Sequence, residues 1–374
     1  MQVKAIEPGS CHIQQSASVF ELRIETPLPP PNHDWILPAA LPLAMAMGCE
    51  VQFEPAISPL LLQTVPTIQQ IFTAFTGNKW KRVAVGAQPG LVGSRSNDNV
   101  GLFFSGGVDS LYSLIKNRDA ITHLVLVHGF DIRLDQTELF SLAEAAARQT
   151  AAEFGKQLIV VRTNVRDVSN RYADWGMYHG AALAMVGHAL SSVLGTCIVA
   201  ATYTYANMPC RGSHPLLDPL WSSETMSFVH DGLEANRMQK LALIAGNEAA
   251  LSTLRVCWSS EQEYNCGHCE KCLRTMIALL ALGKLDACPT LPHRIDPALI
   301  RRIVLNGDSI VFSLWEGFEF ETGLPPEVRK AVAHVLANYR LGLWPMTGVS
   351  SGFKRIKSYI RSGYSLTRGL LLGS

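Results

Sequence analysis

The chain has 374 residues, of which 48% are hydrophobic and 17% are charged, which excludes a disordered or fibrous protein and allows one large domain or two moderate ones. Its 32 basic and 31 acidic residues give a formal net charge of +1, so no nucleic-acid partner is predicted from charge. The amino-terminal residues lack the basic start, apolar run and cleavage site of a secretory signal, and we expect a cytoplasmic protein.

The first 95 residues predict a small α/β domain whose role the sequence leaves unknown. Residues 19–24 have the apolar character of a strand, and helical stretches are expected over 38–47 and 58–75. A short strand is expected at 82–85. The residues that follow, 86–99, are rich in glycine, serine and asparagine and predict the boundary between this domain and the next.

Residues 96–253 predict a second domain built around a parallel sheet. Its apolar runs VGLFF, ITHLVLV, QLIVV and TCIVA are short and continuous, as expected of parallel strands covered on both faces. Helical patterns over 136–154 and 176–194 lie between them. This alternation predicts a doubly wound parallel sheet with its ligand at the carboxyl ends of the strands. The apolar stretch 180–201 is then expected to be a buried helix and a buried strand rather than a membrane span.

Residues 254–345 and 346–374 complete the predicted organisation. The first of these segments holds four clustered cysteines and is expected to continue in helices near 273–282, 298–305 and 326–339. The second is a basic tail with no acidic residue, interleaved with aromatic and aliphatic side chains. Such a tail can make a weak contact with a membrane surface or a protein partner, although a solvated terminus has the same composition.

The first chemical motif is a loop between a predicted strand and a predicted helix. It has the sequence SGGVDS and consists of Ser105, Gly106, Gly107, Val108, Asp109 and Ser110. The two glycines let the backbone turn sharply, and the unpaired amides of the following helix form an anion site. The serine hydroxyls can donate to phosphate oxygens, and Asp109 suits a Mg²⁺ ion that accompanies a nucleotide. An ordinary N-capped turn uses the same residue types, so the prediction depends on the whole string and its position.

This loop resembles the signature of the PP-loop ATP pyrophosphatase superfamily, whose members cleave ATP between the α and β phosphates and adenylate a carbonyl oxygen. The resemblance implies a Rossmann-like sheet of the adenine nucleotide alpha hydrolase type, with ATP lying across the strand ends. It also implies catalytic roles for Ser105, Asp109 and Ser110. By the same analogy, ATP contacts residues at the ends of the second and third strands, which are Val127, His128, Gly129, Thr163 and Asn164.

Four cysteines have the spacing C-x8-C-x2-C-x2-C, at Cys257, Cys266, Cys269 and Cys272. Four thiolates at this spacing suit a closed tetrahedral Zn²⁺ site with a structural role. An iron–sulfur cluster also takes four cysteines, and two disulfides would use the same residues. Nine cysteines in a chain without a secretion signal favour metal in a reducing compartment, so Zn²⁺ is the predicted occupant and the other two readings remain alternatives.

The loop, the four cysteines and Arg274 together resemble 7-cyano-7-deazaguanine synthases, over about residues 99–283. Enzymes of that family use ATP to convert a deazaguanine carboxylate through an amide into a nitrile, with ammonia as the nitrogen source. The resemblance therefore implies formation of an amide or a nitrile. A changed substrate is expected, because the family's Tyr-Gly-Gln motif is replaced by HGFD at 128–131 and its substrate loop is only echoed by PCR at 209–211.

Residues 202–224 follow the fourth predicted strand and are expected to form the substrate half of the site, since they are polar and rich in proline. The candidate substrate contacts in this segment are Arg211, His214, Asp218 and Ser222. Lys240, on a predicted helix further along, is a candidate to stabilise phosphate charge in the transition state. His179 and His188 lie on apolar helix faces and are predicted to be core residues.

The predicted reaction is adenylation of a small-molecule or peptide carboxylate, or of an amide, by Mg-ATP, with release of pyrophosphate. Ammonia or an amine then displaces AMP, because no glutaminase nucleophile is evident in the sequence. Two alternatives stay open: sulfur transfer to a tRNA base through Cys210, or nucleotide binding that only regulates a protein partner. The sequence does not decide whether the chain forms a homodimer.

Overall fold

The computed structural model describes residues 1–343 except 16, 17, 92, 93, 96, 258, 259, 261, 306–308 and 320. The chain divides into two compact units, Met1–Ile295 and Asp296–Ser374, which are described separately. The basic tail predicted over 346–374 lies outside the described residues.

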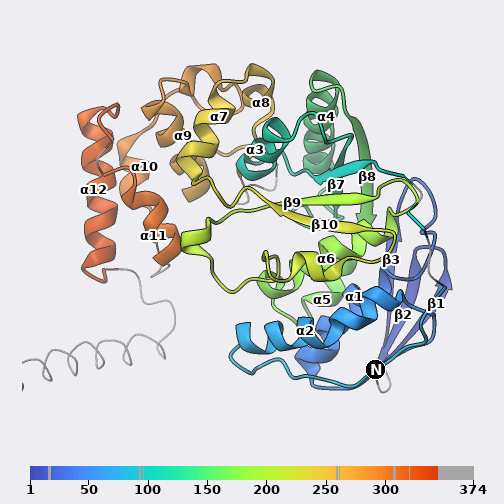
Figure 1. Cartoon of the computed structure of the whole chain (residues 1–374). Coiled ribbons are helices and arrows are strands. Elements are labelled where there is room, and N and C mark those ends of the chain that lie inside the picture. The colour runs from blue at the N-terminus through green and yellow to red at the C-terminus, as the bar shows by residue number, and fades with distance from the viewer. Residues whose placement is uncertain are drawn as a thin grey trace, which may run out of the picture. The chain divides into compact units, whose positions relative to one another are not determined.

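A mostly parallel sheet forms the centre of the first unit (Figure 1). In the described part of the chain it has ten strands, in the order β10-β9-β6-β7-β8-β3-β2-β1-β4-β5. The five strands β10 to β8 pair in parallel; they are β10 (Ser227–Asp231), β9 (Thr196–Ala200), β6 (Val100–Phe103), β7 (His123–His128) and β8 (Gln157–Thr163). The remaining strands are β3 (Ser18–Glu25), β2 (Ser10–Gln15), β1 (Gln2–Glu7), β4 (Val51–Phe53) and β5 (Val85–Gly86).

The order of the parallel strands reverses at β6. From this strand the chain first builds outward through β7 and β8, and it then returns to place β9 and β10 on the opposite side of β6. Connections that leave two neighbouring strands in opposite directions open a crevice at their carboxyl ends, which is where ligands bind in sheets of this kind. The predicted α/β class and largely parallel sheet are therefore confirmed, and the SGGVDS loop lies at the reversal because it directly follows β6.

The amino-terminal strands extend this sheet across the domain boundary predicted between residues 95 and 96. β3 pairs antiparallel with β8 through Ile24 opposite Thr163 and Glu25 opposite Arg162. β1 and β2 were not predicted: β1 buries only Val3, β2 buries Ser10, Cys11 and Ile13, and the polar residues of both strands resemble a loop. One boundary between compact units falls at Ile295.

Helices cover both faces of the sheet in the first unit (Figure 1). One face carries α3 (Val108–Lys116), α4 (Thr137–Glu153), α7 (Arg237–Ala245), α8 (Glu248–Thr253) and α9 (Glu270–Ala281). The other face carries α1 (Ile36–Met47), α2 (Pro59–Phe75), α5 (Val165–Ser169) and α6 (Trp175–Ala189). Tyr178 of α6 is fully buried and donates to the carbonyl of Ala39 in α1 at 2.5 Å, which joins the amino-terminal helices to the central layer.

The apolar stretch 180–201 folds as the sequence predicts, into the end of α6 and the buried strand β9. Among the described residues, no helix combines the length and the apolar character that crossing a membrane requires.

The second unit consists of helices in its described residues. These are α10 (Pro297–Arg301), α11 (Ser309–Glu316) and α12 (Pro326–Arg340). Phe312 stacks on Tyr339 at a centroid distance of 4.2 Å, and Arg340 forms ion pairs with Glu316 and Glu319. These contacts join α11 to α12.

Candidate functional site

The SGGVDS loop makes a tight turn between β6 and α3. Gly106 has a φ of +73°, a left-handed conformation that strains any residue with a Cβ atom. Gly107 is the N-cap of α3, so the first amides of that helix have no partner within the helix. The Ser110 hydroxyl donates to the Gly107 carbonyl at 3.1 Å, whereas Ser105 is exposed. The loop thus presents backbone N–H groups at the carboxyl edge of the sheet.

Residues next to Cys257 and Cys266 contact this loop and support it. The Arg255 amide donates to the Gly106 carbonyl at 2.9 Å. The Tyr264 hydroxyl donates to the Thr253 carbonyl at 2.7 Å, and its oxygen would lie 3.6 Å from a Cβ at position 106. Asn265 accepts from the amides of Val256 and Cys257 at 2.8 and 3.1 Å. One main-chain hydrogen bond, from Arg255, therefore connects this segment to the loop, and the Tyr264 and Asn265 side chains hold the segment itself.

Asp109 is held by two groups from distant parts of the chain. One carboxylate oxygen accepts from Lys240 Nζ at 3.1 Å, and the other accepts from the Thr202 hydroxyl at 3.2 Å. Lys240 is only 1% exposed, and it also donates to the Ala201 carbonyl at the end of β9. A buried ammonium needs a counter-charge, so Lys240 and Asp109 stabilise each other. The structure thus brings together two predicted catalytic residues that are 131 positions apart.

A second charged network joins α3 to the residues that follow β10. Tyr112 and Lys116 both donate to Glu234, at 2.7 and 2.6 Å, and Lys116 also pairs with Asp231 at 2.8 Å. Burial opposes ionisation of Glu234, but the hydrogen bonds from Lys116 and Tyr112 outweigh it and lower its pKa to about 2. Burial and the Glu234 carboxylate raise the pKa of Tyr112 to about 12. These groups anchor α3, whose first turn carries Asp109.

A cluster of three cations, Arg237, Lys271 and Arg274, lies near Asp109, and we call it the cationic cluster. Burial and the charges of Arg237 and Arg274 lower the pKa of Lys271 to about 7, while Asp131 and Asp109 oppose that shift. Burial and Arg237 likewise lower the pKa of Arg274 to about 10. Repulsion of this kind is relieved when an anion binds between the cations.

Two members of the cationic cluster have donors without hydrogen-bond partners. Arg274 is 4% exposed, and its Nε lies 3.2 Å from Glu270 in an ion pair that lacks hydrogen-bond geometry. Within the described residues, Nη1 of Arg274 and Nε of Arg237 are buried without a hydrogen-bond partner. Buried donors of this kind are costly unless a ligand or water pairs with them. Arg237 and Lys271 were not predicted as site residues, because nothing in their local sequence distinguishes them from surface charges.

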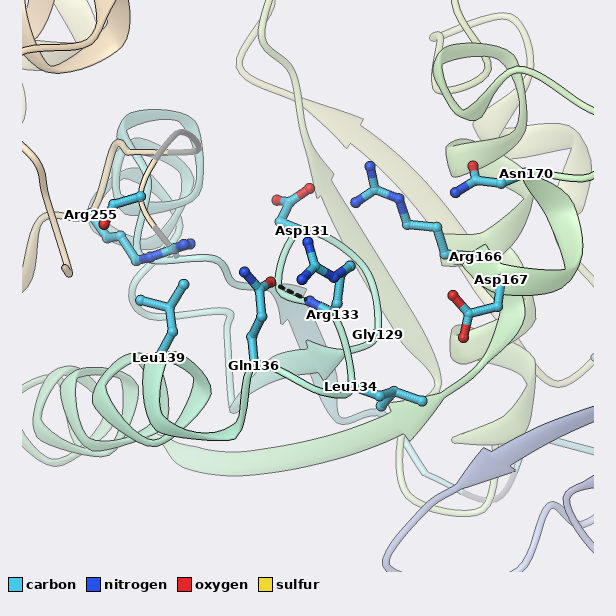
Figure 2. A pocket seen from close by; sticks show the side chains of 11 residues that line it. Gly129, Asp131, Arg133, Leu134, Gln136, Leu139, Arg166, Asp167, Asn170 and Arg255 are labelled. Carbon is cyan, nitrogen blue, oxygen red and sulfur yellow. Dashed lines mark hydrogen bonds between the residues drawn. The ribbon is translucent and has the colours of Figure 1, made fainter. Parts of the chain in front are cut away.

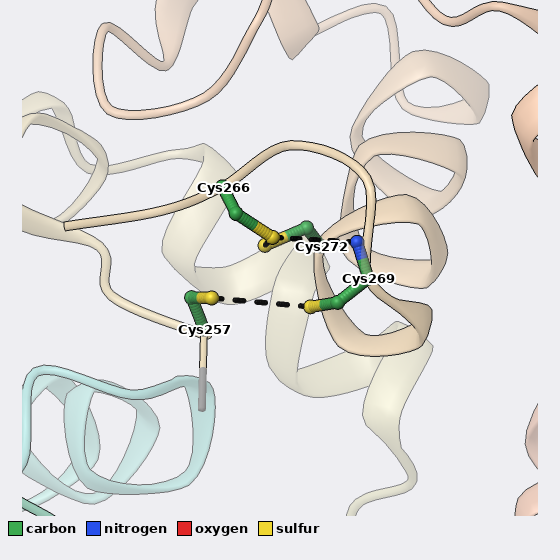
Figure 3. A group of neighbouring side chains, drawn as sticks. All are labelled: Cys257, Cys266, Cys269 and Cys272. Atoms are coloured by element: carbon green, nitrogen blue, oxygen red, sulfur yellow. Dashed lines mark hydrogen bonds between the residues drawn. The ribbon is translucent and has the colours of Figure 1, made fainter. Parts of the chain in front are cut away.

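The four predicted cysteine ligands converge at one point (Figure 3). All four sulfurs lie within 4.8 Å of one another, with Cys257 to Cys269 and Cys266 to Cys272 both at 3.9 Å. Disulfide sulfurs are about 2.05 Å apart, so these are free thiols. A tetrahedron with Zn–S bonds of about 2.3 Å has edges of about 3.8 Å, which fits these distances. The cluster could therefore hold a metal ion such as zinc.

The predicted nucleotide contacts beyond the loop are already engaged in the fold. His128 is fully buried, stacks on Phe140 at 3.9 Å and bonds the Arg133 carbonyl through Nε2. The side chains of Thr163 and Asn164 hydrogen-bond the main chain of β3, at 2.7 to 2.9 Å. A Cβ at Gly129 would lie 1.8 Å from the Thr163 carbonyl, so only glycine fits there. Val127, in β7, is partly buried.

The predicted substrate contacts belong mostly to the internal packing of their segment. Asp218 is 2% exposed and accepts from His230 Nδ1 at 2.6 Å, from the Ser213 hydroxyl at 2.8 Å and from the His214 amide at 3.2 Å. The Ser222 hydroxyl accepts from the Phe228 amide at 3.1 Å. Burial lowers the pKa of His214, which is 8% exposed.

Arg211 and Cys210, from the same segment, are more accessible than Asp218 or His214. Arg211 is partly exposed and lies beside the first turn of α6, where a Cβ at Gly176 would be 2.7 Å from its Nη1. Cys210 is exposed and free. As predicted, His188 is a core residue: its ring is fully buried and bonds the Trp221 carbonyl at 2.7 Å.

A charged cavity of about 270 Å³ lies at the carboxyl ends of β7 and β8 (Figure 2). Its lining consists of Gly129, Asp131, Arg133, Leu134, Gln136, Leu139, Arg166, Asp167, Asn170, Arg255 and Ser260. Most of these side chains are polar or charged, and the sequence predicted only Gly129 among them. The cavity adjoins the SGGVDS loop through Arg255, whose amide donates to the Gly106 carbonyl. Comparison of the chain with protein-family models, with curated proteins and with solved structures finds no match to any of them.

Proposed function

We propose that the chain is a PP-loop ATP pyrophosphatase with a Rossmann-like nucleotide-binding sheet that joins a carboxylate, or an amide, to a nitrogen nucleophile. The observation that carries this proposal is the arrangement at the end of β6. A glycine turn that exposes helix amides lies at the reversal of the strand order, beside Asp109 and the cationic cluster of Arg237, Lys271 and Arg274. Amides without a helix partner and buried or partly buried cations around one carboxylate suit a polyphosphate that carries a metal ion.

ATP would place its phosphates on the loop amides, with the exposed Ser105 hydroxyl as a further donor; the buried Ser110 hydroxyl would have to leave the Gly107 carbonyl in order to donate to a phosphate. Asp109 would hold Mg²⁺, since its side chain is 22% exposed and each carboxylate oxygen keeps lone pairs beyond its bond to Lys240 or Thr202. The bound ion would neutralise part of the phosphate charge. Lys240 orients this carboxylate and balances its charge.

In the first step, a carboxylate oxygen of the substrate forms a bond to the α-phosphorus while the bond to the bridging oxygen of pyrophosphate breaks. Pyrophosphate leaves with the electron pair, and the cationic cluster stabilises the charge that develops on it. The crevice holds the two reactants in line, which lowers the entropic part of the barrier. In the second step, a nitrogen nucleophile attacks the acyl carbon and AMP leaves.

The four cysteines would hold structural Zn²⁺. All four ligand positions of a tetrahedral ion are filled by protein thiolates, so none is open for substrate. Arg255, Tyr264 and Asn265, which lie next to the cysteines, support the SGGVDS loop. The metal would therefore hold the loop in position without contacting the reactants.

The proposal is tested by measuring pyrophosphate release from Mg-ATP with a panel of carboxylic acids, with hydroxylamine added to trap acyl-adenylates as hydroxamates. We expect at least one acid to stimulate release, and Asp109→Ala to reduce that rate by about 100-fold or more. The matched control is Asp119→Ala, since Asp119 is fully exposed near the other end of α3. A chain that binds ATP but releases no pyrophosphate with any acid would refute the proposed activity.

A further inference from the structure

The charged cavity at the ends of β7 and β8 contains a buried cation without a partner. Arg255 is 7% exposed and lines the cavity, and its guanidinium makes no hydrogen bond to any residue that the structure describes. In Figure 2 this guanidinium points into the space between α4 and the loop that carries Asp131. Burying a guanidinium without a hydrogen-bond partner lowers the stability of the fold much more than burying a paired one. The position therefore calls for an anionic group of a ligand.

Two carboxylates face the same cavity. Asp131 and Asp167 line it, and within the described chain neither side chain has a hydrogen bond or an ion pair. Arg166, by contrast, is already engaged, because it donates to the Phe130 carbonyl and stacks on the Trp175 ring at 5.1 Å. The cavity thus offers an unpaired cation and unpaired anions at separate points of its wall.

The size and the lining argue against a purely aromatic ligand. The cavity volume is about 270 Å³, and Leu134 and Leu139 are the only apolar side chains among the residues that line it. A flat aromatic base would bury its faces against few apolar atoms here, whereas binding sites for such rings are mostly apolar. A small ligand with charges of both signs can pair with Arg255 and with the carboxylates at once.

We propose that this cavity binds a free amino acid, with its carboxylate on Arg255 and its ammonium group on Asp131. This inference rests on the proposed function and names its nitrogen nucleophile. Arg255 contacts the SGGVDS loop through its main chain, since its amide donates to the Gly106 carbonyl, and Asp131 lines the same cavity as Arg255. An amine held at Asp131 is therefore next to the place where the acyl-adenylate forms.

The reaction that follows is balanced without an oxidant or a further reactant. The amino group loses one proton to solvent, and its nitrogen lone pair forms a bond to the acyl carbon. The bond from that carbon to the AMP oxygen breaks, and AMP leaves with the electron pair. One of the two protons then left on the nitrogen is lost to solvent and the other stays on the amide, so the products are an N-acyl amino acid and AMP.

Isothermal titration calorimetry on the full-length protein without ATP tests this inference. The probes are the standard L-amino acids, together with β-alanine and γ-aminobutyrate, whose longer spacing between the charged groups measures the separation of the two anchors. We expect saturable binding of at least one probe. Its N-acetylated form and its carboxamide form should each bind about tenfold more weakly or worse, because each loses one charged hydrogen bond.

Three variants place the ligand in the cavity. Arg255→Gln and Asp131→Asn should each weaken binding about tenfold or more, and Asp131 is exposed, so its variant keeps the fold intact. Arg118→Gln is the control, since Arg118 is exposed at the end of α3 and pairs only weakly with Asp119. Absence of binding by every probe, unchanged affinity in Arg255→Gln, or displacement of the amino acid by ATP would each overturn the inference. Pyrophosphate release with an acid and no amino acid reports on the proposed adenylation separately, so the two can fail independently.

Discussion

The SGGVDS loop and the four-cysteine cluster are joined by the segment that contains Arg255, yet their residues come from differently spaced parts of the sequence. The cysteines are all supplied by one short segment, and the paired sulfurs are 12 and 6 positions apart. Asp109 of the loop is completed by Thr202 and Lys240, which are 93 and 131 positions away. The comparison shows that the candidate metal site is local in sequence, whereas the candidate site around Asp109 depends on the packing of α3, α7 and β9.

The largest effect is expected at the cysteine cluster. Structural zinc sites contribute about 10 kcal/mol or more of apparent binding free energy, so Cys266→Ser should lose stoichiometric metal and unfold the turn that supports Gly106. Elemental analysis and thermal unfolding of the purified variant measure this. Cys210→Ser is the control, because Cys210 is exposed and lies outside the cluster. Wild-type protein without zinc, or with iron and visible absorbance, would show that the metal assignment is wrong.

The next largest effect separates the two partners of the loop site. Asp109→Ala leaves the Lys240 ammonium buried at 1% exposure without a counter-charge, which should cost about 3 to 5 kcal/mol. Lys240→Met leaves Asp109 at 22% exposure, where water can solvate it, and should cost about 1 to 3 kcal/mol. Urea denaturation of both variants and of the double variant measures the coupling. Costs in the reverse order would contradict the view that Asp109 is the counter-charge of a buried Lys240.

A smaller effect isolates the backbone of the loop. Gly106→Ala should lower the free energy of unfolding by about 1 to 2 kcal/mol, because a Cβ at φ +73° is strained while its nearest neighbours lie at an ordinary 3.6 Å. Gly246→Ala is the control, since Gly246 has a φ of −82° at the end of α7. Equal stability of the two variants in chemical denaturation would contradict a strained loop.

The smallest effect is expected at Glu234, which accepts hydrogen bonds from Lys116 and Tyr112 of α3. The pKa of Glu234 is lowered from 4.5 to about 2, so its ionised form stabilises the fold above pH 4.5 and this contribution is lost as the pH falls toward 2. Its side chain is 46% exposed, and screening should keep the contribution below about 1 kcal/mol. Glu234→Gln should flatten the acid limb of a stability–pH profile by that amount. An unchanged profile would show that Lys116 and Tyr112 do not hold this carboxylate.

Much of the fold could be predicted because it depends on local patterns. Continuous apolar runs identified β6 to β9, and the periodicity of residues 136–154 and 176–194 identified α4 and α6. The strands β1 and β2 were not predicted, since their alternation of apolar and polar residues is short and their polar residues resemble a loop. Pairing of β3 with β8 could not be foreseen, because no local signal specifies which sheet edge a strand will extend.

By itself, the sequence determined the loop SGGVDS, the cluster of four cysteines and the α/β class, because glycine turns, thiol spacing and apolar runs act over a few residues. Only the tertiary structure decided that Lys240 pairs with Asp109, that Arg237, Lys271 and Arg274 form one cluster, and that Arg255 faces a charged cavity. It also assigned Asp218 and Ser222 to the packing of their own segment. The physical reason is that the pKa and the interactions of a charged side chain depend on its burial and its neighbours, and both are set by contacts between residues far apart in the chain.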